Sequence, residues 1–201
     1  MKNPFIGCFN KSVIVTYLGL ASSLSGIATL LIQNPYESIN RMDIAMILLI
    51  FAGICDLFDG FIARKCKRNE TQKQFGIQID SLVDVISFLV FPAIILLKMN
   101  TNMLLLCILY LITGVTRLAW FNIHTDGHTD YYQGLPVTFI AFFAPIIYSL
   151  NLGFNHVVFP ILYSIISLLF VLNIPIKKPK SLVAYLAFII IAVGVVVLIA
   201  C

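Results

Sequence analysis

Long apolar runs, separated by short polar stretches, dominate the pattern of this chain. A helix needs about 20 mostly apolar residues to cross a bilayer, and several runs reach or approach that length. The predicted spans cover residues 13–32, 44–65, 76–97, 103–121, 135–150, 157–172 and 182–200. We therefore expect an all-α, polytopic integral membrane helical bundle with six to eight transmembrane helices, seven being the preferred number.

Short polar stretches predict the connections. Asn34-Pro35 marks a turn after the first span, and residues 66–75 (C-K-R-N-E-T-Q-K-Q-F) are predicted to form a polar loop before the third. The fifth span is short and starts at Pro136, so its limits stay open. The first span follows Lys2 and Lys11 as in a signal peptide, but its apolar core exceeds the usual 7 to 15 residues. We interpret it as a retained first helix.

Composition supports the same class of fold. Hydrophobic residues make up 60% of the chain and charged residues only 11%, with a mean hydropathy of +1.00. These values exclude a water-soluble globule. Seven spans with short loops use nearly all 201 residues, so a single membrane domain over 1–201 is expected.

Lys and Arg are distributed unevenly between the two sides of the predicted bundle. With the N-terminus in the cytoplasm, only Arg41 and Lys98 fall outside, which agrees with the positive-inside rule. The net charge of +4 is then explained by a basic cytoplasmic rim that faces anionic lipid headgroups, and it does not indicate a nucleic-acid-binding surface. The cytoplasmic group contains Lys2, Lys11, Arg64, Lys65, Lys67, Arg68, Lys73, Arg117, Lys177, Lys178 and Lys180.

Four carboxylates interrupt the second and third spans. Asp56 and Asp59 lie about 60° apart on one helix, and Asp80 and Asp84 are separated by one turn of the next. Acidic residues inside a membrane are costly and usually face a cavity, a partner or an ion. A cluster that only ties helices together would cost several kcal/mol without cations or partners. Oxygen-only ligands favour Mg²⁺, Mn²⁺ or Ca²⁺ over zinc, and Arg64 adds a fork for phosphate oxygens.

These residues form the pattern D-x-x-D-G-x-x-A-R, eleven residues, then G-x-x-x-D-x-x-x-D. The pattern resembles the signature of the CDP-alcohol phosphotransferases, membrane enzymes that displace CMP from a CDP-linked lipid or alcohol. Three further runs resemble the phosphatidylserine synthase branch: residues 80–93, 117–122 (R-L-A-W-F-N) and 134–138 (G-L-P-V-T). The eight defining positions are Asp56, Asp59, Gly60, Ala63, Arg64, Gly76, Asp80 and Asp84.

The resemblance implies a reaction and roles for these residues. The enzyme would transfer the phosphatidyl group from CDP-diacylglycerol to L-serine at a site near the cytoplasmic face, using two divalent cations, Mg²⁺ or Mn²⁺. A homodimer is also implied. Asp84 would be the general base. The implied metal ligands are Asp56, Asp59, Asp80 and Asp84, and the implied nucleotide and phosphate contacts are Asp56, Gly60, Ala63, Arg64 and Gly76.

Serine as the acceptor is implied by the resemblance, and two further residues are candidates for binding it. Arg117 and Asn122 near the end of the fourth span are candidates for binding serine, although Arg117 is equally explained as an interfacial anchor. Glycerol 3-phosphate or inositol phosphate are the alternative acceptors. The alternative that is not an enzyme is a cation or proton transporter that uses the carboxylates as a relay. Such a relay would spread its acidic residues across the membrane, and Arg64 would repel a permeating cation.

Overall fold

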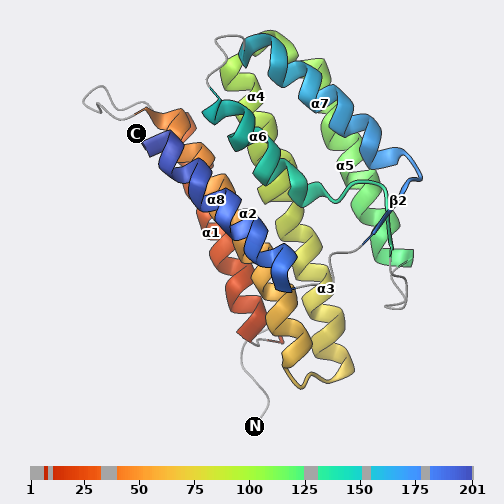
Figure 1. Cartoon of the computed structure of the whole chain (residues 1–201). Helices are drawn as coiled ribbons and strands as arrows, with labels where there is room; N and C mark the ends of the chain where they lie inside the picture. The colour runs from red at the N-terminus through yellow and green to blue at the C-terminus, as the bar shows by residue number, and fades with distance from the viewer. Residues whose placement is uncertain are drawn as a thin grey trace.

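The computed structural model describes residues 7–8, 11–32, 40–124, 131–150, 155–177 and 182–200. Within these ranges the chain forms a bundle of helices that run up and down along a common direction (Figure 1). The helices are α1 (Lys11–Leu31), α2 (Arg41–Lys65), α3 (Glu70–Asp84), the π-helical segment η1 (Val85–Val90), α4 (Phe91–Met99), the 3₁₀ turn η2 (Thr101–Met103), α5 (Leu104–His124), the 3₁₀ turn η3 (Val137–Phe139), α6 (Ile140–Ser149), α7 (Asn155–Val171) and α8 (Leu182–Ala200).

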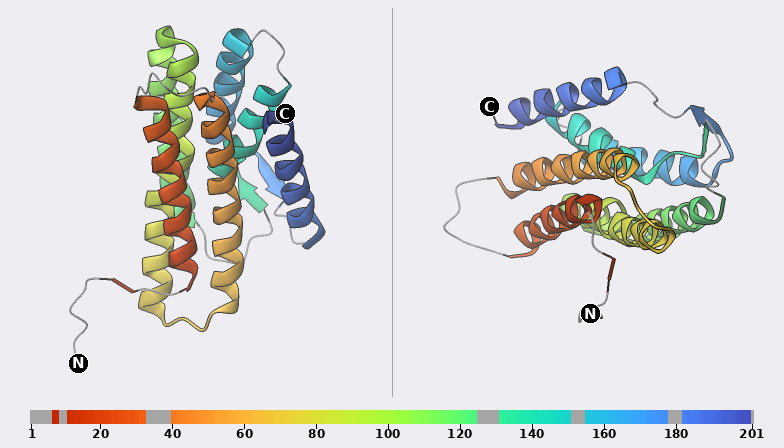
Figure 2. Two further views of the ribbon diagram at one scale, coloured as in Figure 1. Left: turned by 90° about the vertical axis from the view of Figure 1, so that its left-hand side faces the viewer. Right: turned by 90° about the horizontal axis from the view of Figure 1, so that it is seen from below.

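The helices stack in layers. Seen along the bundle in Figure 2, α1, α3, α4 and α5 form one layer, α2, α6 and α7 form the next, and α8 lies on the far side of α2 and α6. Four described stretches are long and apolar enough to cross a membrane: Lys11–Leu31, Arg41–Lys65, Glu70–Met99 and Thr101–His124. Shorter apolar helices follow at Val137–Ser149, Asn155–Val171 and Ile190–Ile199. The predicted polytopic membrane bundle is confirmed.

The predicted loop over residues 66–75 is wrong in its second half. The chain re-enters a helix at Glu70 because Asn69 forms a reciprocal cap with Gln72. The Gln72 N–H donates to Asn69 Oδ1 at 2.8 Å, and the Asn69 N–H donates to Gln72 Oε1 at 3.1 Å. The first turns of α3 consist mostly of polar residues, so a search for apolar runs does not detect them. Gly76 therefore lies inside α3 rather than at its start.

A short antiparallel strand pair was not predicted either. β1 (Tyr131–Gln133) pairs with β2 (Pro175–Lys177), with Tyr132 opposite Ile176. It joins the chain entering α6 to the chain leaving α7, on the right-hand side of Figure 1. Strands of only three residues are too short to show an alternating side-chain pattern, so this backbone pairing could not be predicted from the sequence.

Small buried residues on one face of α1 bring it close to α2. Ser12, Thr16, Gly19, Ser23 and Gly26 recur at alternating intervals of four and three residues and are buried. A Cβ at Gly19 would lie 3.1 Å from the Cβ of Cys55 on α2. Small residues let membrane helices approach closely, so that packing and interhelical hydrogen bonds hold them. This contact sets the position of α1 beside the acidic residues of α2.

The helical rod that carries Asp80 and Asp84 contains a wide turn just beyond them. In η1 the Phe91 N–H donates to the carbonyl of Ile86, five residues earlier, and Pro92 has no N–H for the carbonyl of Phe88. The buried Tyr110 hydroxyl donates to that Phe88 carbonyl at 2.6 Å. Wide turns of this type often occur at functional sites, and α5 holds this one in place.

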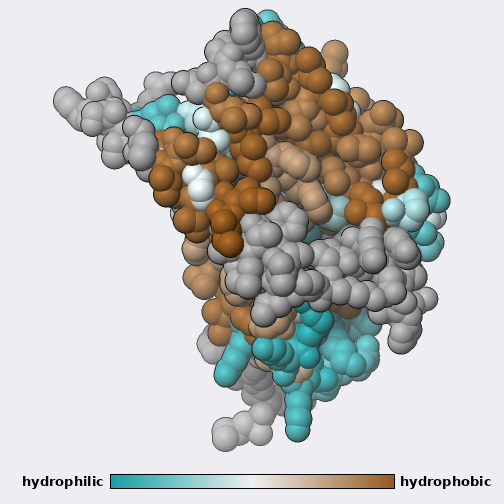
Figure 3. All heavy atoms as spheres, in the orientation of Figure 1, coloured by the Kyte–Doolittle hydropathy of each residue, from teal (hydrophilic) through white to brown (hydrophobic). Residues whose placement is uncertain are grey.

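The surface separates into an apolar part and a polar end. In Figure 3, hydrophobic side chains cover the upper part of the visible face, and hydrophilic ones gather at the lower end, where α2 and α3 are joined. Exposed side chains at that end include Lys65, Lys67, Glu70 and Lys73.

Candidate functional site

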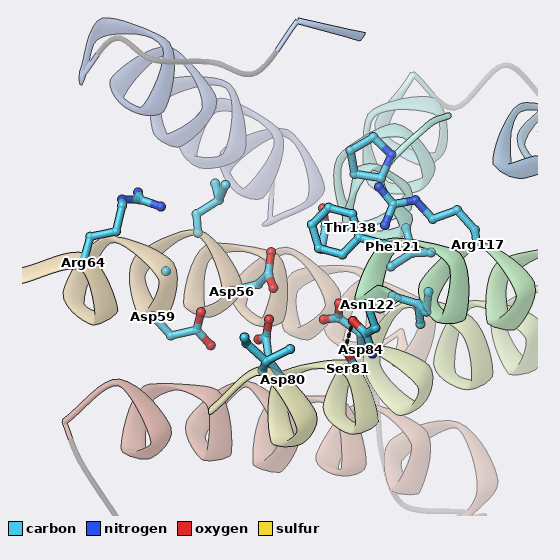
Figure 4. A pocket seen from close by; sticks show the side chains of 16 residues that line it. Asp56, Asp59, Arg64, Asp80, Ser81, Asp84, Arg117, Phe121, Asn122 and Thr138 are labelled. Atoms are coloured by element: carbon cyan, nitrogen blue, oxygen red, sulfur yellow. Dashed lines mark hydrogen bonds between the residues drawn. The ribbon is translucent and has the colours of Figure 1, made fainter. Parts of the chain in front are cut away.

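Three carboxylates from two helices converge inside the bundle. Asp56 points from α2 toward Asp80 and Asp84 on α3 (Figure 4). One oxygen from each of the three lies within 4.8 Å of the others. The motif positions that are about 25 residues apart in sequence thus meet at one place, because α2 and α3 run antiparallel from a short connection.

Asp59 lies beside this group with a different set of contacts. Its side chain is buried at 6% exposure, and its Oδ2 accepts a hydrogen bond from Thr16 Oγ1 of α1 at 2.6 Å. Figure 4 shows its carboxylate directed toward Asp80. The three-oxygen group does not include Asp59, so this residue approaches the cluster from the α1 side.

Two cavities meet along the line of these acids. One has a volume of about 330 Å³ and the other of about 240 Å³. Residues from α2 and α3 form their shared wall. That wall consists of Asp59, Gly60, Arg64, Ile77 and Asp80.

The smaller cavity lies between α1, α2 and α3, and we call it the α1 cavity. Besides the shared wall it is lined by Ala63 and Gly76, together with Ser12, Val13, Thr16 and Arg68. A Cβ at Gly76 would lie 3.3 Å from Arg68 Nη1, and one at Gly60 would lie 3.7 Å from Arg64 Nη1. Two guanidinium groups therefore lie over the glycines. The motif residues with implied phosphate roles line this cavity, except Asp56.

The larger cavity lies between α2, α3 and α5, and we call it the α5 cavity. It contains Asp56 and Asp84 and the two candidate acceptor residues, Arg117 and Asn122. Ser81 Oγ donates to Asn122 Oδ1 at 2.9 Å. The Arg117 side chain is buried, and its guanidinium carbon lies 4.7 Å from the centre of the Phe121 ring, a cation–π contact.

The G-L-P-V-T run forms one wall of the α5 cavity through Pro136, Val137 and Thr138. Backbone contacts hold this wall: the Gly134 N–H donates to Ile174 O at 3.0 Å, and the Leu135 N–H donates to Leu169 O at 3.1 Å. Gly134 has φ +74°, and a Cβ there would lie 2.9 Å from the carbonyl oxygen of Phe170. Only glycine fits this position without strain.

Sequence reasoning missed several residues that line the two cavities. Thr16 lies outside the motif, and only the small-residue face of α1 points to it. Ser81 stands between two motif aspartates, where its role depends on a partner 41 residues away. Phe121 and Thr138 belong to the runs 117–122 and 134–138 that resemble the family branch, but their place in the α5 cavity depends on the packing of α5 and η3.

The donor set fits a hard divalent cation. The group of Asp56, Asp80 and Asp84 offers carboxylate oxygens only. Cations of the Mg²⁺, Mn²⁺ and Ca²⁺ type bind oxygens at roughly 2.0 to 2.6 Å, so opposite ligands stand about 4 to 5 Å apart. A separation within 4.8 Å is compatible with one shared ion. Asp59, directed toward Asp80, adds a further carboxylate beside this group.

Fold and site together define an integral membrane helix bundle with an acidic, arginine-flanked double cavity set into its helices. The family model for CDP-alcohol phosphatidyltransferase matches residues 9–200. The chain belongs to this family, as its motif predicts.

Curated relatives share part of the sequence. The chain is 33% identical over 141 residues to an archaetidylserine synthase of Methanothermobacter thermautotrophicus, covering 66% of this chain and 58% of the relative. Two proteins named CDP-diacylglycerol–serine O-phosphatidyltransferase are also similar. The one from Helicobacter pylori is 35% identical over 108 residues (51% and 44% of the two chains), and the one from Saccharomyces cerevisiae is 31% identical over 127 residues (56% and 45%). The chain spans about half the length of the curated relatives it matches.

Proposed function

We propose that the protein transfers the phosphatidyl group from CDP-diacylglycerol to L-serine, forming phosphatidylserine and CMP. The observation that supports this most directly is the pair of cavities meeting at Asp59 and Asp80. A donor with a pyrophosphate and an acceptor with a hydroxyl each need a compartment, and the reacting phosphorus must lie where the two compartments join. The names of three relatives, which refer to serine transfer or to archaetidylserine, agree with this choice.

The α1 cavity suits the nucleotide end of the donor. Arg64 and Arg68 present guanidinium groups over Gly60 and Gly76, and arginine binds phosphate oxygens in a bidentate geometry. Ala63 adds no bulk to the same wall. We assign phosphate binding to Arg64 and close approach of the nucleotide to these small residues.

Asp56, Asp59, Asp80 and Asp84 would hold two divalent cations, Mg²⁺ or Mn²⁺. Such cations, when bound, neutralise the pyrophosphate and stabilise the charge that develops on departing CMP. The carboxylates would hold these cations where the two cavities join. In this arrangement Asp56 serves both the cation site and the phosphate position that the motif implies.

Asp84 is our candidate for the general base. It lines the α5 cavity, where the acceptor enters, and not the α1 cavity. As the serine hydroxyl oxygen forms a bond to the phosphorus that carries the lipid, its proton passes to the Asp84 carboxylate. The bond between that phosphorus and the CMP oxygen breaks, and CMP leaves with the electron pair.

Arg117 and Asn122 are our candidates for recognising serine. A carboxylate entering a cavity lined by aspartates needs a cation opposite to it, and the Arg117 guanidinium supplies one. Ser81 donates to the oxygen of the Asn122 side chain. The NH₂ group of Asn122 is then the end directed to a substrate carboxylate. The pair thus favours an acceptor with a carboxylate over one without.

We further propose that the end of the bundle where α2 and α3 are joined faces the cytoplasm and that the enzyme acts as a homodimer. Arg64, Lys65, Lys67 and Lys73 are exposed where α2 and α3 are joined, which agrees with the positive-inside rule. A membrane-impermeant thiol reagent should label Cys66 in inverted vesicles but not in intact cells. Light scattering of the detergent-purified protein would give the number of copies.

The central experiment measures CMP release by the purified protein. CDP-diacylglycerol and Mn²⁺ or Mg²⁺ are supplied with serine, glycerol 3-phosphate or inositol phosphate as acceptor. We expect release with serine to exceed release with either alternative at least tenfold. Robust release with another acceptor and none with serine would overturn the acceptor while leaving the family assignment intact.

A further inference from the structure

Thr16 of α1 is in direct contact with a motif carboxylate, although it lies 40 residues before the motif begins. Its Oγ1 is 2.6 Å from Asp59 Oδ2 and 3.1 Å from the backbone carbonyl oxygen of Ser12. A threonine hydroxyl has one proton to donate. The shorter distance and the charged acceptor both favour donation to Asp59.

This contact is buried and closely held. Thr16 and Asp59 are each 6% exposed, and Gly19, one turn further along α1, holds that helix against Cys55 of α2. The packing of α1 against α2 therefore keeps the Thr16 side chain next to Asp59. The bond holds Oδ2 on the α1 side, and the Asp59 carboxylate is directed toward Asp80 at the junction of the two cavities (Figure 4).

We propose that Thr16 is a positioning residue for the cation site: its hydroxyl keeps the Asp59 carboxylate turned toward Asp80 at the junction of the two cavities. This inference rests on the cation site proposed above. It makes α1 a third helix of that site, beside α2 and α3. Partners that orient metal ligands typically change affinity by about 10- to 100-fold when they are removed.

The chain offers a matched control on the same helix pair. Ser22 Oγ donates to the backbone carbonyl of Leu48 at 2.8 Å, so it also ties α1 to α2 by one hydrogen bond. Ser22 lines neither the α1 cavity nor the α5 cavity. Ser22→Ala removes an interhelical hydrogen bond without touching Asp59.

The experiment measures Mn²⁺ binding to the full-length protein, without substrates, by isothermal titration in detergent. Thr16→Val keeps the side-chain shape but removes the hydroxyl, and we expect about tenfold weaker binding. Thr16→Ser restores the donor, so it and Ser22→Ala should stay within about twofold of the unmutated protein. In the CMP-release assay, Thr16→Val should raise the Mn²⁺ concentration for half-maximal rate about tenfold and leave the KM for serine unchanged.

Three results would overturn the proposal. Unchanged Mn²⁺ affinity in Thr16→Val would show that the hydroxyl does not orient a ligand. An equal loss in Ser22→Ala would show that only the packing of α1 matters. No Mn²⁺ binding by the unmutated protein would remove the cation site itself, and the proposed function with it. If Thr16→Val does not yield monodisperse protein, Thr16→Ala replaces it, with the same expected loss.

Discussion

Because three carboxylates lie close together, we predict that one substitution has opposite effects on the stability of the cation-free and the cation-bound protein. At the 4.8 Å limit that encloses their oxygens, two full negative charges repel by about 3.5 kcal/mol at an effective dielectric constant of 20. Asp80 takes part in two of the three pairs, which gives about 7 kcal/mol if all three carboxylates are ionised, and protonation of some of them in the absence of a cation lowers this value. Asp80→Asn keeps the side-chain shape and removes both repulsions.

We therefore expect Asp80→Asn to stabilise the protein in EDTA. Water and structural relaxation offset much of the repulsion, so a gain of at least about 1 kcal/mol is expected, or about 2 to 4 °C in Tm for a chain of this size. With Mn²⁺ the order should reverse. Binding at 100 times Kd stabilises by about 2.7 kcal/mol, and the variant should lose most of that gain because it lacks a ligand.

The assay is thermal unfolding in detergent, with EDTA or with a Mn²⁺ titration. Glu70→Gln is the control, since it removes one negative charge from α3 at an exposed position. Its Tm should respond to Mn²⁺ like that of the unmutated protein. Equal Tm values for Asp80→Asn and the unmutated protein in EDTA, together with equal Mn²⁺ responses, would refute the reasoning that the three carboxylates share a cation.

Three further predictions address the base, the acceptor and the packing. Asp84→Asn should still bind CDP-diacylglycerol, whereas CMP release at saturating substrates should fall about 100-fold or more; lost nucleotide binding with intact turnover would make Asp84 chiefly a ligand. Arg117→Lys should raise the KM for serine about tenfold and leave the KM for CDP-diacylglycerol nearly unchanged, because lysine cannot form the bidentate pair; an equal rise for both substrates would indicate a structural anchor. Gly53→Ala should lower Tm by the equivalent of about 1 to 3 kcal/mol, since the added Cβ would lie 2.8 Å from that of Ala141. Gly194→Ala in α8, with nothing within 4 Å, should not lower Tm, because alanine is the better helix former.

Two features of the protein could be predicted from the sequence because their causes are local. The helical spans follow from the length of apolar segment that a bilayer requires, and each of the seven predicted runs largely coincides with helices of the described chain, although residues 135 and 136 precede η3 and are not helical. The acidic motif follows from fixed spacings on two neighbouring helices. Helical periodicity alone places Asp80 and Asp84 on one face, and the short connection after Lys65 makes their helix antiparallel to α2.

The division of the site into two cavities, by contrast, was decided by tertiary structure. It depends on α1 and α5 approaching the same pair of helices from opposite sides. The helical periodicity of α1 or α5 does not predict which helices each of them packs against. Thr16 meets Asp59 because Gly19 lets α1 close on α2, and Ser81 meets Asn122 only once α5 packs against α3. A hydrogen bond between distant segments needs a position accurate to a few tenths of an ångström, which close packing provides and sequence pattern does not.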